Sequence, residues 1–88
     1  MSYGLVLSQQ AKKAFKLLDK GIIKRLEQRF CELSLAPYDP RLSKPLAMGE
    51  GELTSRVGKW RILYLVNEAE KIIYVFSIEP REKAYRRY

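Results

Sequence analysis

A single glycine between two runs of strand-forming residues constrains the fold of this chain more than any other feature. Gly58 and Lys59 separate the run 53–57 from the longer run 60–66. Glycine at the first central position of a two-residue loop is the signature of a type II′ turn, which joins antiparallel strands. The sequence therefore predicts a β-hairpin with Gly58 at its tip.

This hairpin would place two arginines side by side. Counting outward from the loop, Arg56 faces Arg61 on the same side of the sheet. Like charges directly opposite each other destabilise a sheet, and a bound anion removes the conflict. The planar guanidinium group suits phosphate because it can donate two parallel hydrogen bonds. We therefore expect a phosphate-directed surface on the sheet.

The same register separates an apolar face of the hairpin from a mixed one. The face expected to cover the helices carries Leu53, Val57, Trp60, Ile62, Tyr64 and Val66. The opposite face carries Thr54, Arg56, Arg61, Leu63 and Leu65. A slip of one residue would exchange the faces and bury both arginines, which is too costly.

Two helices are expected before the hairpin. Ser8 is the expected N-cap of the first helix, and Asp19 is the expected N-cap of the second. In the second helix, apolar side chains recur at the spacing of one helix face, at Ile22, Leu26, Phe30 and Leu33. The two helices would form an antiparallel hairpin.

The remaining strands complete an α+β domain that spans residues 1–88. A short strand is expected at 3–7 and a last strand at 71–78, ended by Pro80. Prolines and glycines interrupt the segment 34–51, so no regular element is expected there. The predicted order is an N-terminal strand, a two-helix hairpin and an antiparallel three-strand meander, with the helices packed on one face of a twisted sheet.

Charge and composition narrow the function. The chain carries 17 Lys and Arg against 10 Asp and Glu, and this net charge of +7 implies a polyanionic partner.

With no histidine and only Asp19 and Asp39 besides glutamates, we expect no metal, no cofactor and no Ser–His catalysis. A single cysteine excludes an internal disulfide. With no signal peptide and no apolar run long enough for a membrane, we expect a cytoplasmic protein.

Basic residues and tyrosines are the side chains left for chemistry, and they gather in the hairpin and the C-terminal tail. The tail contributes Arg81, Lys83, Tyr85 and Arg86. Aromatic rings among cations can stack on unpaired bases while the cations hold the backbone. Such residues could also cleave RNA without metal, because arginines can stabilise the charge that develops when the ribose 2′-hydroxyl attacks the adjacent phosphate.

Two motifs resemble those of the RelE/ParE toxin superfamily, and most closely its RelE-like branch. Residues 56–64 are similar to the hairpin motif of that family, in which Arg-Val-Gly, an aromatic residue and a second arginine follow one another. Residues 78–85 are similar to its C-terminal motif, an arginine followed four residues later by a tyrosine. The likeness covers almost the whole chain.

The resemblance implies the toxin of a type II toxin–antitoxin pair, which cuts mRNA in the ribosomal A site and is neutralised by an acidic antitoxin. By position, it implies that Arg61 and Arg81 bind phosphate and stabilise the transition state, and that Tyr85 stacks on or helps to activate the RNA. Arg56 matches a further basic position. We therefore expect Arg61, Arg81 and Tyr85 to be catalytic and Arg56, Lys44, Lys59, Lys83 and Arg86 to bind RNA.

The general base stays open, and so do two other functions. Some RelE toxins carry catalytic lysines on the strand before the hairpin, where this chain has Glu52 and Thr54. Lys44, Lys59 or Lys83 could substitute for them. The alternatives are a ParE-like protein that inhibits DNA gyrase without catalysis, and an inactive basic module that binds RNA or protein.

Overall fold

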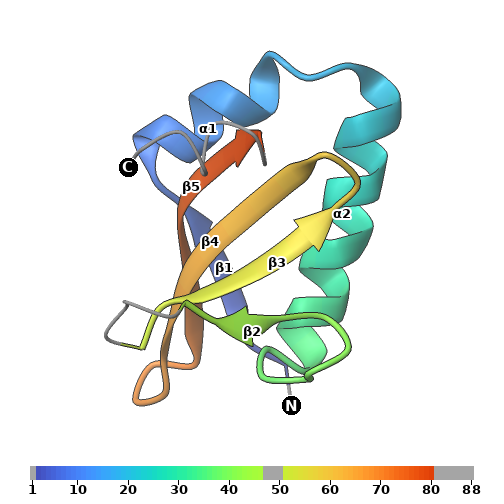
Figure 1. Ribbon diagram of the computed structural model, residues 1–88. Helices are drawn as coiled ribbons and strands as arrows, with labels where there is room; N and C mark the ends of the chain where they lie inside the picture. Colours follow the sequence, from blue (N-terminus) through green and yellow to red (C-terminus); the bar gives the residue numbers. More distant parts are fainter. Residues whose placement is uncertain (1, 47–50, 81–88) are drawn as a thin grey trace.

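The computed structural model describes residues 2–46 and 51–80. The elements follow one another along the chain as β1 (Gly4–Leu7), α1 (Gln9–Lys16), α2 (Lys20–Leu35), β2 (Lys44–Pro45), β3 (Leu53–Val57), β4 (Trp60–Asn67) and β5 (Ile72–Pro80). Both helices pack on one face of the sheet (Figure 1). The predicted α+β architecture is therefore confirmed.

Each helix begins at the polar residue expected to cap it. The Ser8 hydroxyl accepts a hydrogen bond from the Ala11 amide at 3.1 Å and donates one to the Phe76 carbonyl at 2.9 Å, which ties α1 to β5. The Asp19 carboxylate accepts a hydrogen bond from the Ile22 amide at 3.0 Å. Within the described ranges, no helix is long and apolar enough to cross a membrane.

The sheet has the strand order β1-β5-β4-β3-β2. Strands β3, β4 and β5 form the predicted antiparallel meander, and β1 adds to β5 in parallel. The first strand begins one residue later than expected, at Gly4, and the last one extends to Pro80.

The expectation that the segment 34–51 holds no regular element is wrong. Lys44 and Pro45 form β2, which pairs with Thr54 and Leu53 of β3. Alternate residues of an antiparallel edge strand direct their backbone groups to solvent, so proline is tolerated at such a position. The Leu46 amide continues the pairing with a hydrogen bond to the Glu52 carbonyl at 3.0 Å.

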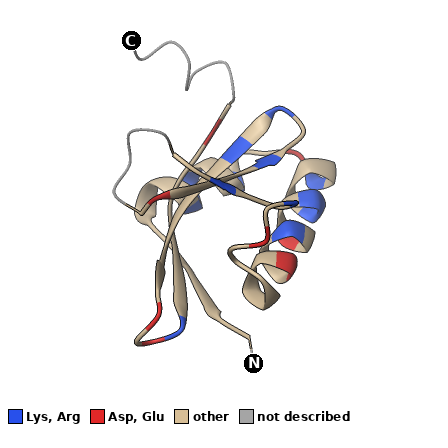
Figure 2. Ribbon diagram, turned by 60° about the horizontal axis from the view of Figure 1, so that its bottom comes forward, with Lys and Arg blue, Asp and Glu red and all other residues tan. Residues whose placement is uncertain are grey.

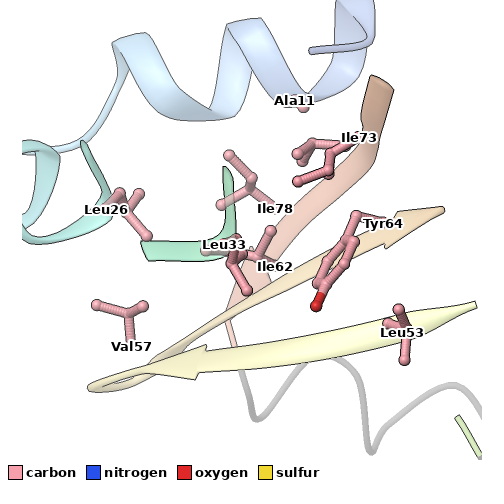
Figure 3. Packing of buried hydrophobic residues seen from close by; sticks show 10 residues of the cluster. Ala11, Leu26, Leu33, Leu53, Val57, Ile62, Tyr64, Ile73 and Ile78 are labelled. Atoms are coloured by element: carbon pink, nitrogen blue, oxygen red, sulfur yellow. The ribbon is translucent and has the colours of Figure 1, made fainter. Parts of the chain in front are cut away.

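One apolar core joins the two helices to the sheet (Figure 3). Its fully buried side chains include Leu26 and Leu33 from the expected stripe of α2, together with Ile62 and Tyr64 from β4. Leu53 and Val57 are also buried, and Trp60 and Val66 pack against the cluster, so the expected apolar face is confirmed.

The loop after α2 is anchored in this core. The buried Tyr64 hydroxyl donates a hydrogen bond to the Pro37 carbonyl at 2.6 Å, and the Ser43 hydroxyl donates to the same oxygen at 3.2 Å. Burial raises the pKa of the Tyr64 hydroxyl, so it remains a donor at neutral pH. These contacts hold the loop that leads to β2 against the sheet.

A β-bulge changes which residues of β5 face the helices. Tyr64 of β4 pairs with Val75, but Leu63 pairs with Ser77, so Phe76 is the extra residue of the bulge. Before the bulge Val75 points into the core, and after it Ile78 does. Without the extra residue, strict alternation from Val75 would direct Ser77 and Glu79 into the core.

The turn between β4 and β5 is held to two other segments of the chain by hydrogen bonds to Glu68. The Glu68 carboxylate accepts hydrogen bonds from the Tyr38 hydroxyl at 2.6 Å, the Tyr3 hydroxyl at 3.0 Å and the Lys71 ammonium at 3.0 Å. These donors come from three separate segments. They lower the pKa of Glu68, with the Tyr38 hydrogen bond as the largest cause, and that same bond raises the pKa of Tyr38 to about 12.

The type II′ turn makes a stability prediction. Gly58 has a φ of +60°, and a Cβ built on it would lie 3.1 Å from Nη1 of Arg25. We expect Gly58→Ala to lower the free energy of unfolding by about 1–3 kcal/mol, because a side chain is strained at this φ. Urea unfolding measures the change. The control is Gly21→Ala, where α2 leaves room for a Cβ and alanine favours the helix, so stability should rise. Equal stability of the parent and Gly58→Ala would contradict the assigned turn.

The Glu68 contacts make a pH prediction. Because folding lowers the pKa of Glu68, its contribution to stability is present above the unfolded value near 4.5 and is lost as the pH falls through the folded value. Glu68→Gln should therefore lower the thermal midpoint at neutral pH. The difference from the parent should shrink as the carboxyl group is protonated. A difference that stays constant down to acidic pH would show that the charge of Glu68 is not involved.

Candidate nucleic-acid interface

The two predicted arginines face each other on the side of the sheet that lies away from the helices. Arg56 of β3 pairs directly with Arg61 of β4, as the turn at Gly58 required. Arg56 is exposed and Arg61 is half-buried. Val57 and Trp60 flank the two-residue loop, and Arg56 and Arg61 are the next pair. In such a hairpin this next pair has no mutual backbone hydrogen bonds. The Cα atoms of pairs of this type are typically only ~4.5 Å apart, so their side chains lie close together. Two guanidinium groups therefore share one small area of the surface.

Glu79 is a neighbour of this pair that the sequence patterns did not reveal. It pairs with Arg61 from the other side, across β4 and β5, and only 6% of it is exposed. The Ser77 hydroxyl donates a hydrogen bond to its carboxylate at 3.1 Å. Arg56, Arg61 and Glu79 thus form one row across three strands, two cations followed by a carboxylate.

A basic hollow lies beside the row, at the edge of the sheet. It has a volume of about 260 Å³ and is bounded by α2, the loop before β2, and β3. Its polar lining comes from Arg29, Arg41, Ser43, Lys44, Thr54 and Arg56. We call it the edge hollow. Because Arg56 belongs to both, the edge hollow and the arginine row are continuous.

The predicted lysines lie near this end of the molecule. Lys44 is exposed on β2 and pairs with Thr54, which is two residues before Arg56 on β3. Lys59 is exposed at the tip of the hairpin, beside Gly58. Of the other predicted site residues, Arg81, Lys83, Tyr85 and Arg86 lie outside the described residues.

Helix α2 contributes two arginines that no sequence pattern singled out. The Arg29 guanidinium donates hydrogen bonds to Glu32 at 3.0 Å, to the Ser55 hydroxyl at 2.7 Å and to the Arg56 carbonyl at 2.8 Å. Arg25 lies one turn earlier, with its guanidinium over Gly58. In Figure 2 the basic residues of α2 lie beside those of the hairpin.

The position of Arg29 beside the buried face of α2 could have been predicted from helical spacing. It falls three residues after Leu26 and four before Leu33, so it flanks the buried face of α2. A long basic side chain in that position reaches the edge of the neighbouring sheet and leaves its charge at the surface. The basic surface therefore extends from the sheet around its edge to the helix.

Thr54 is one of the two positions at which the resemblance to RelE toxins led us to look for a lysine. It is 3% exposed, and its hydroxyl has no hydrogen-bond partner in the described parts of the chain. Leu63, its partner on β4, is 9% exposed, so this face of the sheet is not uniformly open to solvent as its mixed composition suggested. A buried hydroxyl without a partner costs free energy, which makes Thr54 notable.

Comparison with known proteins gives one matching family. The family model for the ParE toxin of the type II toxin-antitoxin system, parDE, matches residues 5–85. No curated protein matches the sequence.

Solved structures of RelE proteins share the fold. The archaeal RelE–RelB complex from Pyrococcus horikoshii OT3 superposes with a TM-score of 0.75 and 27% identity, over 92% of this chain and 97% of that one. The toxin–antitoxin complex RelBE2 from Mycobacterium tuberculosis gives 0.80 and 23%, over 92% and 100% of the two chains. A mutant of the E. coli toxin RelE in the free state gives 0.82 and 18%, over 97% and 90%.

The apposed arginines predict an anion-dependent stability. In low-salt chloride buffer, Arg56→Gln should raise the free energy of unfolding by about 0.2–1 kcal/mol, because it removes a like charge directly opposite Arg61. Inorganic phosphate should stabilise the parent more than this variant, which has lost one arm of the site.

The matched control is Lys24→Gln, which removes one positive charge from an exposed position of α2. Phosphate should stabilise Lys24→Gln as much as the parent, as thermal unfolding with and without phosphate would show. If phosphate stabilised Arg56→Gln and the parent equally, the arginine pair would not be an anion site.

Proposed function

This chain belongs to the ParE toxin family within the RelE/ParE superfamily of type II toxin–antitoxin toxins, and from that premise we propose that it is a ribosome-dependent mRNA endonuclease. The observation that carries the proposal is the Arg56–Arg61 pair on the face of the sheet that lies away from the helices. Apposed guanidinium groups are unfavourable in the free protein and favourable around a phosphate whose charge increases during the reaction.

The proposed reaction uses the RNA itself as the nucleophile. The ribose 2′-hydroxyl loses its proton and attacks the adjacent phosphorus, and the bond from phosphorus to the 5′-oxygen of the next nucleotide breaks. That oxygen takes up a proton, so the products are a 2′,3′-cyclic phosphate and a 5′-hydroxyl end. Arg61 would stabilise the added charge on the non-bridging oxygens, with Arg56 beside it. For Arg81 and Tyr85, which lie outside the described residues, we propose the catalytic roles that the family resemblance implies.

The proposed protein partner is an acidic antitoxin. The relatives from Pyrococcus horikoshii and Mycobacterium tuberculosis were solved as complexes of toxin and antitoxin. The net charge of +7 on this chain favours a partner of opposite charge. A basic surface that binds RNA would also attract such a partner, so binding of the antitoxin and of RNA should compete.

A second candidate function is inhibition of DNA gyrase without catalysis. Two observations favour it. The matching family model is that of the ParE toxin, and Glu52 and Thr54 stand where some RelE toxins have catalytic lysines. The ribonuclease is preferred because the arginine row offers a site for a phosphate in reaction, which gyrase inhibition would not need.

Mapping of mRNA ends in a translating extract tests the proposed function. The parent should produce new ends on ribosome-bound mRNA that carry a 2′,3′-cyclic phosphate. Arg61→Lys should cut ~10²–10³-fold more slowly, because it keeps the charge but loses the planar fork. Lys24→Gln should cut at the parental rate.

Two outcomes would contradict different parts of the proposal. Parental activity of Arg61→Lys would overturn the role of Arg61 and leave the endonuclease standing. Intact mRNA together with inhibited plasmid supercoiling by purified gyrase would overturn the endonuclease and establish the second candidate.

A further inference from the structure

We propose that the edge hollow is a second phosphate subsite, which holds the RNA backbone at the phosphodiester next to the one bound by Arg56 and Arg61. This inference rests on the proposed function for its ligand, single-stranded RNA. The hollow is lined by residues of α2, the loop before β2, β2 and β3, and lies at the β2 edge of the sheet.

The charges around the edge hollow favour an anion. Two of its four cations are already compensated, since Arg29 pairs with Glu32 at 3.0 Å and Arg41 pairs with Asp39 at 3.0 Å. Lys44 and Arg56 line the same hollow and have no ion pair with any residue in 2–46 or 51–80. Within those ranges the hollow thus holds two positive charges without an ion pair, one on Lys44 opposite Thr54 and one on Arg56 two residues along β3.

The side chain of Thr54 also favours a ligand in the edge hollow, for a reason that does not depend on charge. Its hydroxyl is buried and has no partner among residues 2–46 and 51–80, although burial of a polar group is normally accompanied by a hydrogen bond. Thr54 lies between Lys44, its partner on β2, and Arg56, two residues along β3. Rotation of its side chain about χ1 would let the hydroxyl donate to a phosphate oxygen held by these two cations.

Hydrogen bonds between α2, β3 and the loop before β2 hold one side of the hollow in place. Arg29 is fixed by its hydrogen bonds to the Ser55 hydroxyl and the Arg56 carbonyl, and the Ser55 hydroxyl in turn donates to the Leu42 carbonyl at 2.7 Å. This chain of contacts joins α2, β3 and the loop before β2. The cavity is therefore held open by the fold and does not depend on the ligand for its shape.

The lining indicates which part of the RNA would bind. Among the residues that the structure describes, none of those bordering the edge hollow is aromatic, so this lining offers no ring on which a base could stack. Its cations and hydroxyl groups suit the sugar–phosphate backbone, and contacts of that kind position the strand without reading its sequence. Since Arg56 borders the hollow and faces Arg61, a strand seated there would present its neighbouring phosphodiester to the arginine row.

Binding of a 2′-O-methylated single-stranded RNA oligonucleotide tests this subsite, because such an RNA cannot be cut through its 2′-oxygen. Affinity is measured over a range of salt concentrations for the parent, Lys44→Gln and the control Lys24→Gln. Loss of one phosphate contact should reduce the slope of log affinity against log salt by about 0.7. We expect this reduction for Lys44→Gln, equally for oligonucleotides of different sequence, and parental slopes for Lys24→Gln.

Thr54→Val provides a second arm, because the two side chains have nearly the same shape. The variant should raise the thermal midpoint of the free protein, since a buried unpaired hydroxyl is removed. It should also weaken RNA binding while leaving the salt slope unchanged, since no charge is lost. A variant that is stabilised and binds RNA as the parent does would overturn the role of Thr54.

The outcomes separate this inference from the proposed function. If Lys44→Gln kept the parental slope while mRNA was still cut, the subsite would be wrong and the endonuclease would stand. If the slope fell as expected but mRNA stayed intact on ribosomes, the subsite would stand and the endonuclease would fail. If a peptide rich in Asp and Glu bound with the expected slope change and the RNA did not, the edge hollow would be a site for an acidic protein instead.

Discussion

The register of the β3–β4 hairpin is the constraint on which the rest of this structure depends. Gly58 adopts a backbone conformation that other residues avoid, and it thereby fixes which residues of the two strands lie opposite each other. Because side chains alternate along a strand, that one pairing assigns every residue of β3 and β4 to a face. The same choice buries Ile62 and Tyr64 under the helices and brings Arg56 against Arg61 on the other side. Stability of the core and repulsion at the surface are thus consequences of one turn.

Beyond the hairpin, the β5 bulge decides the composition of the site. The extra residue, Phe76, reverses the alternation, so that Ile78 enters the core and Glu79 joins the row of Arg56 and Arg61. A carboxylate next to Arg61 partly balances two like charges that would otherwise face each other alone. The backbone irregularity therefore serves both packing and electrostatics, as bulges near functional sites often do by redirecting a side chain.

The open edge of β3 shows how the fold leaves room for a ligand. Strand β2 covers only Leu53 and Thr54, and beyond it Arg29 reaches from α2 to the carbonyl of Arg56. That contact protects an edge that would otherwise be free to pair with another chain. It also leaves a basic hollow between helix, loop and strand. Protection of the edge and formation of the basic hollow are two results of the same short strand.

The sequence by itself determined the local features of this protein. The turn at Gly58, the caps Ser8 and Asp19, and the apposition of Arg56 and Arg61 could all be predicted, because turn chemistry, capping and alternation depend on residues close in the chain. The tertiary structure alone decided the position of Glu79, the strand at Lys44 and the contacts of Arg29. A bulge leaves no mark in an alternating pattern, and the edge hollow joins residues from α2, β2 and β3 that only folding brings together.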